Sequence, residues 1–277
     1  MQQSNRDEKT IRSFGDEWNR FDQRGLGQDE AAQIFDDYFR LFPWSALPAD
    51  ACGFDMGCGT GRWAKLVAAR VGHLHCVDPS DALDVARSAL QDCPNVTFHR
   101  ASVGDAILPG NSQDFGYSLG VLHHVPDTAA ALRSCVELLK PGAPFLLYLY
   151  YAFDNRSRWF RAVWRCSDLL RRGISRLPPA VKHVVTDLLA ATIYFPLARA
   201  SLLLERMGFK VQSIPLSYYR KRSFYTMRTD SRDRFGTPLE RRFGKEEIAD
   251  MMRGAGLREV RFSDAAPYWC AVGFKTS

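Results

Sequence analysis

The sequence predicts an α/β fold, built on a doubly wound, mostly parallel sheet with N-terminal helices and a large helical insertion after the fifth strand. Two observations predict it. Between residues 52 and 153, short apolar segments alternate with helical segments, as parallel strands joined by crossover helices require. After residue 153 the alternation stops, and it resumes only near residue 244.

Seven segments have the length and composition of strands. The first five lie at residues 53–56, 73–77, 96–100, 115–119 and 144–150. Helices are expected to begin near Gly61, Asp81 and Thr128, the last ending at Leu139 before a Lys-Pro-Gly stop signal. Each connection suits a right-handed crossover. A helix from Gly244 and strands at residues 258–263 and 269–274 then close the sheet.

The chain is expected to form one composite domain. Its 277 residues, 46% of them apolar, can bury a substantial core. We expect an N-terminal helical cap at residues 1–50, a core at residues 51–153 and 244–277, and a basic, partly helical substrate-recognition insertion at residues 154–243. No internal repeat suggests a different division.

Positive charge is concentrated in the insertion. Residues 156–245 contain 20 Lys and Arg against 6 Asp and Glu, whereas the whole chain has a net charge of +6. Such a segment can attract nucleic acid, an anionic membrane face or a phosphorylated substrate. A solvated basic surface is the simpler alternative.

Several patterns bear on location. The first 12 residues are polar, so no export signal is expected. The apolar stretch at residues 188–198 is interrupted by Pro196 and is shorter than the roughly 20 residues needed to cross a bilayer. The 7 Cys form no CxxC pair, which favours reduced thiols, a cytoplasmic location and no metal site.

The segment FDMGCGTGR follows the first predicted strand and opens the first helix. A tight turn with its backbone against a ligand needs residues without Cβ, which Gly57, Gly59 and Gly61 supply. Helix amides beyond Gly61 favour a carboxylate or a polar nucleoside end, and Asp55 suits a cationic amino group. A purely structural turn, or a loop that binds a dinucleotide, remains an alternative.

A second acidic residue strengthens the prediction of a nucleotide site. Asp78 ends the second predicted strand, where a carboxylate can accept hydrogen bonds from both hydroxyls of a ribose. Asp78 could also cap the helix that begins in Asp-Pro-Ser-Asp, because Asp and Ser are good N-caps. The two roles are compatible.

These motifs resemble the class I S-adenosylmethionine-dependent methyltransferases: FDMGCGTG, CVDPS, GDAILP and SLGVLHHVPD, spanning about residues 52–149. The resemblance implies a Rossmann-like sheet of seven strands with an antiparallel last pair, and S-adenosyl-L-methionine as cofactor. It implies that Asp105 recognises the adenine amino group, that Ala106 presents a backbone amide, and that Leu119 and Gly120 flank the site. The cofactor-binding residues it implies are Asp55, Gly57, Cys58, Gly59, Gly61, Asp78, Pro79, Asp105, Ala106, Leu119 and Gly120. Gln113 departs from the family, which often has an aromatic residue before the acid, here Asp114.

Methyl transfer from a sulfonium needs alignment and exclusion of water more than it needs a base. For a hydroxyl acceptor a base is useful. His124, preferred to His123, follows the fourth strand at the sheet edge where ligands of open α/β folds gather. A loop histidine that bonds the following turn is the alternative. His73 and His75 alternate along a strand and are interpreted as structural.

Two regions are expected to contact substrate. Residues 216–239 interleave aromatic and basic side chains in polar loops, from which we select Tyr218, Tyr225, Arg228 and Arg232. Internal pairing among Arg228, Asp230, Arg232 and Asp233 is equally compatible with this pattern. Trp18 of an N-terminal helix could close over the cofactor or belong to the core.

The leading hypothesis is methyl transfer to oxygen or nitrogen of a small or medium-sized metabolite, an anionic one included, bound between the sheet edge and the insertion. Methylation of RNA is a second hypothesis, although nucleic acid is the less favoured partner. A non-catalytic cofactor-binding protein or a peripheral membrane protein is a third, since apolar helices flanked by Arg suit a membrane surface. Core packing or a dimer face is the favoured explanation of those helices. A monomer and a homodimer are both compatible with the sequence, and a dehydrogenase is disfavoured.

Overall fold

The computed structural model describes residues 5–105 and 107–277, which divide into two compact units. The sheet unit contains the described residues up to Asp22, together with Gln33–Ala152 and Leu239–Ser277. The helical unit contains Gln23–Ala32 and Phe153–Pro238. The helical unit therefore includes a short piece of the N-terminal region that the sequence predicts as part of the cap.

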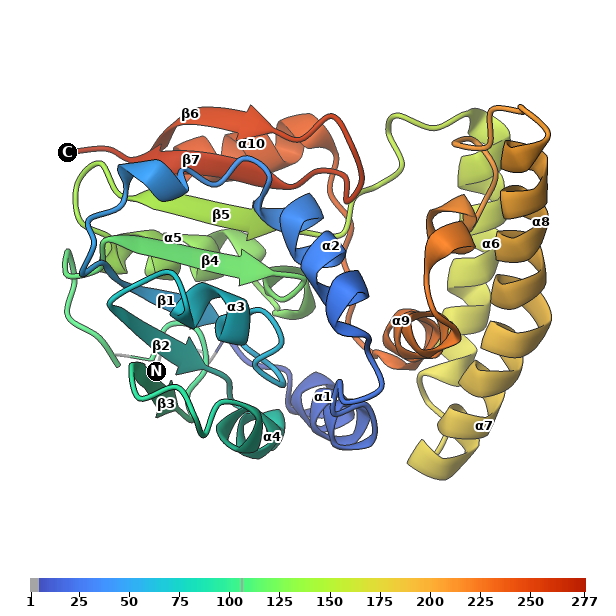
Figure 1. The fold of residues 1–277 in the computed structure, drawn as a ribbon, viewed down its shortest axis with the longest axis horizontal. Helices are drawn as coiled ribbons and strands as arrows, with labels where there is room; N and C mark the ends of the chain where they lie inside the picture. The colour runs from blue at the N-terminus through green and yellow to red at the C-terminus, as the bar shows by residue number, and fades with distance from the viewer. Residues whose placement is uncertain (1–4, 106) are drawn as a thin grey trace. The chain divides into compact units, whose positions relative to one another are not determined.

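A seven-stranded sheet forms the centre of the sheet unit, in the order β3-β2-β1-β4-β5-β7-β6 (Figure 1). Its strands are β1 Cys52–Met56, β2 His73–Val77, β3 Val96–His99, β4 Phe115–Leu119, β5 Pro144–Tyr148, β6 Leu257–Phe262 and β7 Ala271–Lys275. Strands β1 to β5 pair in parallel, whereas β7 is antiparallel to both β5 and β6. The predicted fold class is confirmed. The strand order reverses between β1 and β4, the place where open α/β sheets bind ligands.

Helices cover both faces of this sheet (Figure 1). They are α1 Glu8–Arg20, α2 Gln28–Phe39, α3 Ala64–Ala68, α4 Ala82–Ala89, α5 Thr128–Leu138 and α10 Lys245–Gly254, with short turns η1 Trp44–Ala46 and η2 Leu122–His124. Two begin at an aspartate cap: Asp7 accepts a hydrogen bond from the amide of Thr10, and Asp127 accepts one from Ala130. Polar capping residues thus set the helix starts next to the strand ends.

Each face of the sheet has its own apolar core. On one face, side chains of α2, α3 and α4 such as Phe35, Val67 and Leu83 pack with Phe115 and Tyr117 of β4. On the other face, side chains of α5 and α10 pack with alternate residues of β1 and β5, namely Phe54, Met56, Phe145, Leu147, Leu132, Val136, Ile248 and Met252. The alternation of side chains along each strand supplies both cores at once.

The helical unit consists of α6 Arg158–Ile174, α7 Pro179–Leu189, η3 Ala190–Tyr194, α8 Phe195–Arg206, η4 Ser217–Lys221 and α9 Phe224–Gly236. Its buried apolar cluster is small and contains Tyr194, Ala198, Met227 and Phe235. Helix α9 packs against α6 and α7, and η4 packs against α8. Polar contacts therefore carry much of the packing in this unit.

The structure corrects two expectations about the insertion. The polar aromatic stretch expected to form loops is largely helical, because Phe224–Gly236 is α9, whose N-cap Ser223 accepts a hydrogen bond from the amide of Thr226. Pro196 does not interrupt the apolar stretch either. A wide π turn, η3, comes directly before the proline and carries the chain from α7 into α8.

The resulting continuous helix, Pro179–Arg206, has 28 residues and is long and apolar enough to cross a membrane by length and composition. The apolar stretch at residues 188–198 thus lies within a longer apolar helix. Length and composition do not by themselves distinguish a helix that spans a bilayer from one that lies along it.

Candidate active site

The glycine turn after β1 adopts backbone conformations that favour glycine. Gly57, Gly59 and Gly61 have φ values of +84°, +53° and +75°. The amides of Gly57 and Cys58 both donate to the carbonyl of Val77 at the end of β2, at 2.7 and 3.0 Å. A Cβ on Gly57 would lie 2.4 Å from Cγ1 of Val121. The turn is therefore held against the ends of β2 and β4 and leaves no room for a side chain at Gly57.

Asp78 joins the glycine turn to the start of α4. One carboxylate oxygen accepts a hydrogen bond from the amide of Gly59 at 3.0 Å. The other accepts from the amide of Ser80 at 2.8 Å and from its hydroxyl at 2.6 Å. Burial raises the pKa of Asp78, and the hydrogen bonds from Ser80 and Gly59 act in the opposite direction. Asp78 does not cap α4, whose N-cap residue is Asp81, and its role as a ligand of the ribose stays a prediction.

Asp55 is a buried acid at the centre of the sheet. Its side chain is 2% exposed, and Oδ2 has no hydrogen-bond partner among the described residues. Burial raises the pKa of Asp55 to about 8, against a smaller opposite effect of the Tyr117 hydroxyl on β4. An unpartnered buried carboxyl costs free energy. A cationic amino group placed beside it would favour its ionised form, so Asp55 fits the amino end of S-adenosylmethionine.

A cavity lies beside the glycine turn at the carboxyl ends of the parallel strands. Of the residues predicted from the sequence, Gly57, Pro79 and His124 line it. Its other walls come from residues after β1 to β4 and from the N-terminal segment, namely Asn5, Arg6, Asp7, Ile11, Met56, Val77, Ala101, Ser102, Val103, Val121 and Val125. It encloses about 50 Å³, whereas pockets for drug-sized ligands enclose about 300 Å³ or more. The cavity is therefore smaller than a pocket for a ligand of that size, and the N-terminal segment forms one of its walls.

Two residues of the N-terminal region contact predicted cofactor residues. Arg6 forms an ion pair with Asp105, whose carboxylate also accepts a hydrogen bond from the amide of Ser102. Both side chains of the pair are more than one third exposed, and exposed ion pairs contribute little to stability. The indole nitrogen of Trp18 would lie 3.6 Å from a Cβ on Gly59. Trp18 is thus beside the glycine turn, as a cofactor lid requires.

The remaining cofactor predictions fall at strand ends. Leu119 is the last residue of β4, and Gly120 follows it with φ +77° and donates its amide to the carbonyl of Tyr148 at 2.9 Å. Cys58 is buried within the glycine turn. Ala106 lies outside the described residues.

His124 is buried on the wall of the cavity, in the turn η2 after β4. Its Nδ1 lies 2.6 Å from the carbonyl oxygen of Leu239. Because a carbonyl can only accept, Nδ1 carries the proton, and in the neutral ring the lone pair is on Nε2. Phe14 meets the ring edge to face at 4.9 Å. The orientation of His124 is therefore fixed by contacts on several sides.

His123 has a different environment. Its ring is fully buried and lies 4.0 Å, centroid to centroid, from that of Tyr150. Neither ring nitrogen has a hydrogen-bond partner among the residues described. Burial lowers the pKa of His123 well below its usual range, and His124 adds to this effect. The preference for His124 as a base therefore has a geometric reason, namely its place on the cavity wall.

The four insertion residues predicted to bind substrate are engaged within the helical unit. Arg228 forms a two-pronged ion pair with Asp187, at 3.1 and 2.9 Å. Arg232 is completely buried, and the hydroxyl of Tyr225 accepts a hydrogen bond from the amide of Gln23 at 3.0 Å. The guanidinium of Arg222 lies over Tyr218. Arg228 thus forms an ion pair within the insertion, as one alternative predicted, but its partner in this pair is Asp187 and not Asp230 or Asp233.

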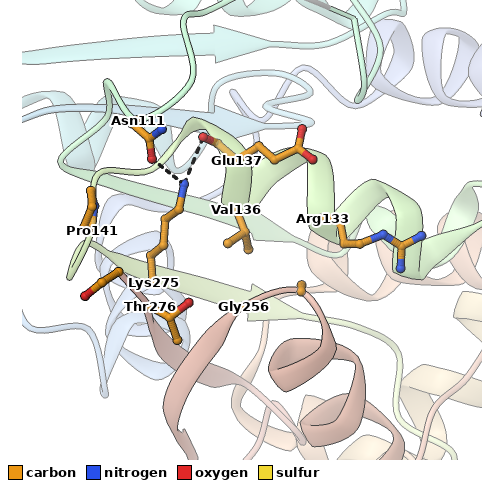
Figure 2. Close-up of a pocket in the computed structure, with 10 residues that line it drawn as sticks. Asn111, Arg133, Val136, Glu137, Pro141, Gly256, Lys275 and Thr276 are labelled. Carbon is orange, nitrogen blue, oxygen red and sulfur yellow. Dashed lines mark hydrogen bonds between the residues drawn. The ribbon is translucent and has the colours of Figure 1, made fainter.

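A second and larger cavity, of about 360 Å³, lies at the opposite edge of the sheet (Figure 2). Lys275 crosses it and donates hydrogen bonds to the side chain of Asn111 and to the carbonyls of Glu137 and Leu139. The ammonium group of Lys275 therefore already has three hydrogen-bond acceptors within the protein. The cavity also lies at the amino ends of β4 and β5, away from the edge where parallel sheets bind ligands.

Comparison with known proteins agrees with this geometry. The family model described as "Methyltransferase domain" matches residues 54–147, from β1 to β5. This match shows a methyltransferase domain over residues 54–147, and the seven-stranded sheet and the glycine turn are those that the resemblance to the class I S-adenosylmethionine-dependent methyltransferases implied. S-adenosylmethionine is the cofactor of this class, as the resemblance of the motifs implied.

Individual relatives cover part of the chain. The ubiquinone biosynthesis O-methyltransferase of Hahella chejuensis is 32% identical over 116 residues, which make up 41% of this chain and 47% of the relative. The enzyme of the same name from Aromatoleum aromaticum is 35% identical over 106 residues, 37% of this chain and 44% of the relative. The chain thus spans about half the length of these relatives. Among solved structures, the S-adenosylmethionine-dependent methyltransferase SibL has a TM-score of 0.53 at 13% identity, covering 91% of this chain and 57% of that one, a likeness in fold.

Sequence reasoning missed the group that surrounds the two histidines. Glu240 and Arg242 form a buried ion pair at 2.8 Å, and Arg242 lies over the ring of Tyr150. The amide of Arg241 donates to the carbonyl of His123 at 3.1 Å. These contacts join segments about 90 to 120 residues apart. No local pattern in the sequence signals them.

Proposed function

We propose that this protein transfers the methyl group of S-adenosylmethionine to an oxygen or nitrogen atom of a small or medium-sized metabolite. The observation that carries the proposal is the glycine turn tied to Asp78, with the buried Asp55 behind it, whose Oδ2 has no hydrogen-bond partner among the described residues. This arrangement offers a backbone cradle and two acids at the switch point of the sheet. Such a set suits a nucleoside with a cationic amino acid end.

Oxygen is the acceptor atom that the curated relatives support. The relatives from Hahella chejuensis and Aromatoleum aromaticum are both named O-methyltransferases, and the matched family domain contains the glycine turn and His124. A hydroxyl acceptor loses its proton during transfer, so a base near it accelerates the reaction. A neutral amine needs no such base.

We infer that His124 is that base, because it lines the cavity beside the glycine turn. The hydrogen bond from Nδ1 to the carbonyl of Leu239 fixes the tautomer that leaves a lone pair on Nε2. When bound, the cofactor supplies an electrophilic methyl group on sulfur. The protein then aligns the acceptor, excludes water and takes up the released proton at Nε2 of His124.

The proposal is tested by incubating the purified protein with methyl-labelled S-adenosylmethionine and fractionated extracts of small metabolites. Mass spectrometry should find a labelled product whose mass exceeds that of its precursor by one methyl group. Fragmentation then locates the label on oxygen or nitrogen. A cofactor that binds but is never consumed with any fraction would refute methyl transfer, and labelled RNA alone would refute the small-molecule acceptor.

A further inference from the structure

The large apolar side chains that are exposed on the described part of the chain lie in one unit. Among the described residues, all 14 exposed large apolar side chains lie between Trp159 and Phe224, in the helical unit. Soluble monomers rarely expose a contiguous apolar patch of more than a few hundred Å², and larger ones mark interaction sites. The sheet unit contributes none of these residues, so the helical unit is the part that requires a partner.

The continuous helix Pro179–Arg206 has its polar and apolar faces reversed relative to a soluble helix. Its outward large side chains are apolar and 40% to 61% exposed, namely Val181, Val184, Leu188, Ile193, Phe195, Leu197 and Leu203. Arg206, at its end, is the exposed charged residue of this fully described stretch. We call the surface formed by those seven apolar residues the outer face.

The charged residues of the same helix other than Arg206 contact groups of the helical unit. Lys182 donates to the carbonyl of Gly236 at 3.3 Å, and Asp187 pairs with Arg228 of α9. Arg199 donates to the carbonyl of Arg220 in η4 at 2.8 Å. A helix that keeps its charges on the protein side and its apolar side chains outside matches an apolar medium on the outside.

Helix α6 repeats this reversal and adds positive charge. At 100° per residue, Trp159, Val163, Leu169 and Leu170 form one exposed apolar arc, with exposed fractions of 51% to 67%. An adjoining arc holds Arg158, Arg161, Arg165 and Arg172. The third arc faces the protein, where Phe160 and Trp164 contact Phe153. Basic residues bordering an apolar arc with a Trp are typical of helices that lie in a membrane interface.

The exposed charges on this surface have one sign. Between Arg156 and Val211, the exposed basic residues are Arg158, Arg165, Arg172, Arg176, Arg206 and Lys210. Asp168, Asp187 and Glu205, the acids of this fully described stretch, are not exposed, and each is paired with an Arg. Two copies meeting through this surface would bring like charges together, whereas an anionic bilayer would complement them.

We propose that the helical unit docks on an anionic lipid bilayer, with α6 and the helix Pro179–Arg206 lying along the interface and the outer face in the acyl region. The helix is about 42 Å long at 1.5 Å per residue. A spanning orientation would draw the inward charges and the polar helix α9 into the hydrocarbon, which is costly. An in-plane orientation leaves them bound within the protein.

Vesicle co-flotation of the full chain tests this proposal. We expect binding to vesicles of phosphatidylglycerol and phosphatidylcholine to exceed binding to pure phosphatidylcholine by at least tenfold. The triple variant Val184→Glu, Leu188→Glu, Leu203→Glu should lose at least tenfold of that binding. The matched control is Ala89→Glu, an exposed change on α4 of the sheet unit, which should bind as the unchanged protein does. Equal binding of the triple variant, or none by the unchanged protein, overturns the proposal.

Two further measurements separate insertion of the outer face from adsorption by charge and from dimer formation. Brominated lipids should quench the fluorescence of Trp159, which is obtained as the difference between the unchanged protein and Trp159→Phe. Flotation without quenching would mean that charge alone adsorbs the protein, and it would overturn the apolar part of the proposal. Light scattering after gel filtration reports a second copy as partner. If the unchanged protein is a dimer that does not bind vesicles, and the triple variant is a monomer, the proposal is also overturned. Circular dichroism checks the fold, and the single variant Leu188→Glu replaces the triple variant if that one unfolds.

Discussion

The carboxylate of Asp78 accepts a hydrogen bond from the backbone amide of Gly59 at 3.0 Å, which links the end of β2 to the middle of the glycine turn. The same carboxylate accepts two hydrogen bonds from Ser80, whose hydroxyl in turn accepts one from the amide of Ala82 at the start of α4. One side chain thus positions both segments that would surround a bound nucleoside. Its loss should affect the ligand site more than the core.

Replacing Asp78 by Ala should weaken S-adenosylmethionine binding by at least tenfold while the fold is retained. The change removes the predicted acceptor for the ribose hydroxyls and leaves the amides of Gly59 and Ser80 without this partner, at a cost of about 1–3 kcal/mol for each buried group. Isothermal titration calorimetry measures the affinity, and circular dichroism checks the fold. Asp92→Ala, an exposed aspartate after α4, is the control and should bind normally. An unchanged binding isotherm for Asp78→Ala would contradict the assignment.

Two glycines of the turn should respond differently to a side chain. Gly57→Ala should lower the free energy of unfolding by about 1–3 kcal/mol, because the new Cβ would lie 2.4 Å from Val121 and φ is +84°. Gly59→Val should abolish cofactor binding. The nearest atom to a Cβ there lies 3.6 Å away, so the side chain adds no overlap at its Cβ, and the φ of +53° alone lowers the free energy of unfolding. Urea denaturation and calorimetry measure the two effects.

The matched control for Gly57→Ala is the double variant that adds Val121→Ala. This second change removes the methyl groups that the new Cβ would meet, so it should recover part of the lost stability. If Gly57→Ala were as stable as the unchanged protein, or if Gly59→Val bound the cofactor at full strength, the turn would not have this geometry.

Asp55 gives the apo protein a defined dependence of stability on pH. Burial raises its pKa to about 8 in the folded protein, against about 3.9 in an unfolded chain. Between these values the folded state holds a proton that the unfolded state has lost. The stability contributed by this group is therefore full below pH about 4 and is lost as the pH rises through about 8.

Asp55→Asn should remove this dependence, because an amide does not ionise. At pH 4 the variant and the unchanged protein should unfold at similar urea concentrations, whereas at pH 8.5 the variant should unfold at a higher one. Cofactor binding should be weaker in the variant, since the amide cannot pair with a cationic amino group. Asp92→Asn controls for the loss of a charge. A variant less stable than the unchanged protein at pH 8.5 would show that the carboxylate is partnered in the fold.

The sheet and the cofactor turn were predictable because their signals are local. Strands 73–77 and 115–119 were located to the residue, since each is a short segment in which apolar residues alternate with others and which turn residues bound. Gly57, Gly59 and Gly61 have the positive φ values that the spacing implied. For such features, the neighbours in sequence are also the neighbours that determine the conformation.

The insertion was harder to predict because its helices are stabilised by distant contacts. Phe224–Gly236 lacks an amphipathic pattern, and its conformation depends on Arg228 meeting Asp187 and on buried Arg232. Pro196 would normally end a helix, but the π turn before it accommodates the missing amide donor. The contacts around His124, including the carbonyl of Leu239, likewise join segments that are far apart in the chain.

His124→Asn tests the base without disturbing the contact that orients it. The amide nitrogen of Asn can take the place of Nδ1 and donate to the carbonyl of Leu239, while nothing replaces Nε2. With a hydroxyl acceptor, kcat should fall by about 10²–10⁴, and calorimetry should give a cofactor affinity within about twofold of the unchanged protein, because the variant alters proton uptake and leaves the glycine turn intact.

The pH profile separates this role from a structural one. If His124 takes up the proton, kcat should rise with pH through a limb that depends on its neutral form, and that limb should be absent in His124→Asn. His124→Ala loses the hydrogen bond to Leu239 as well, so it should show the same chemical defect together with a lower free energy of unfolding. If His124→Asn had the same pH profile and the same kcat as the unchanged protein, the role of His124 would be to stabilise the turn. The acceptor would then be one that needs no base.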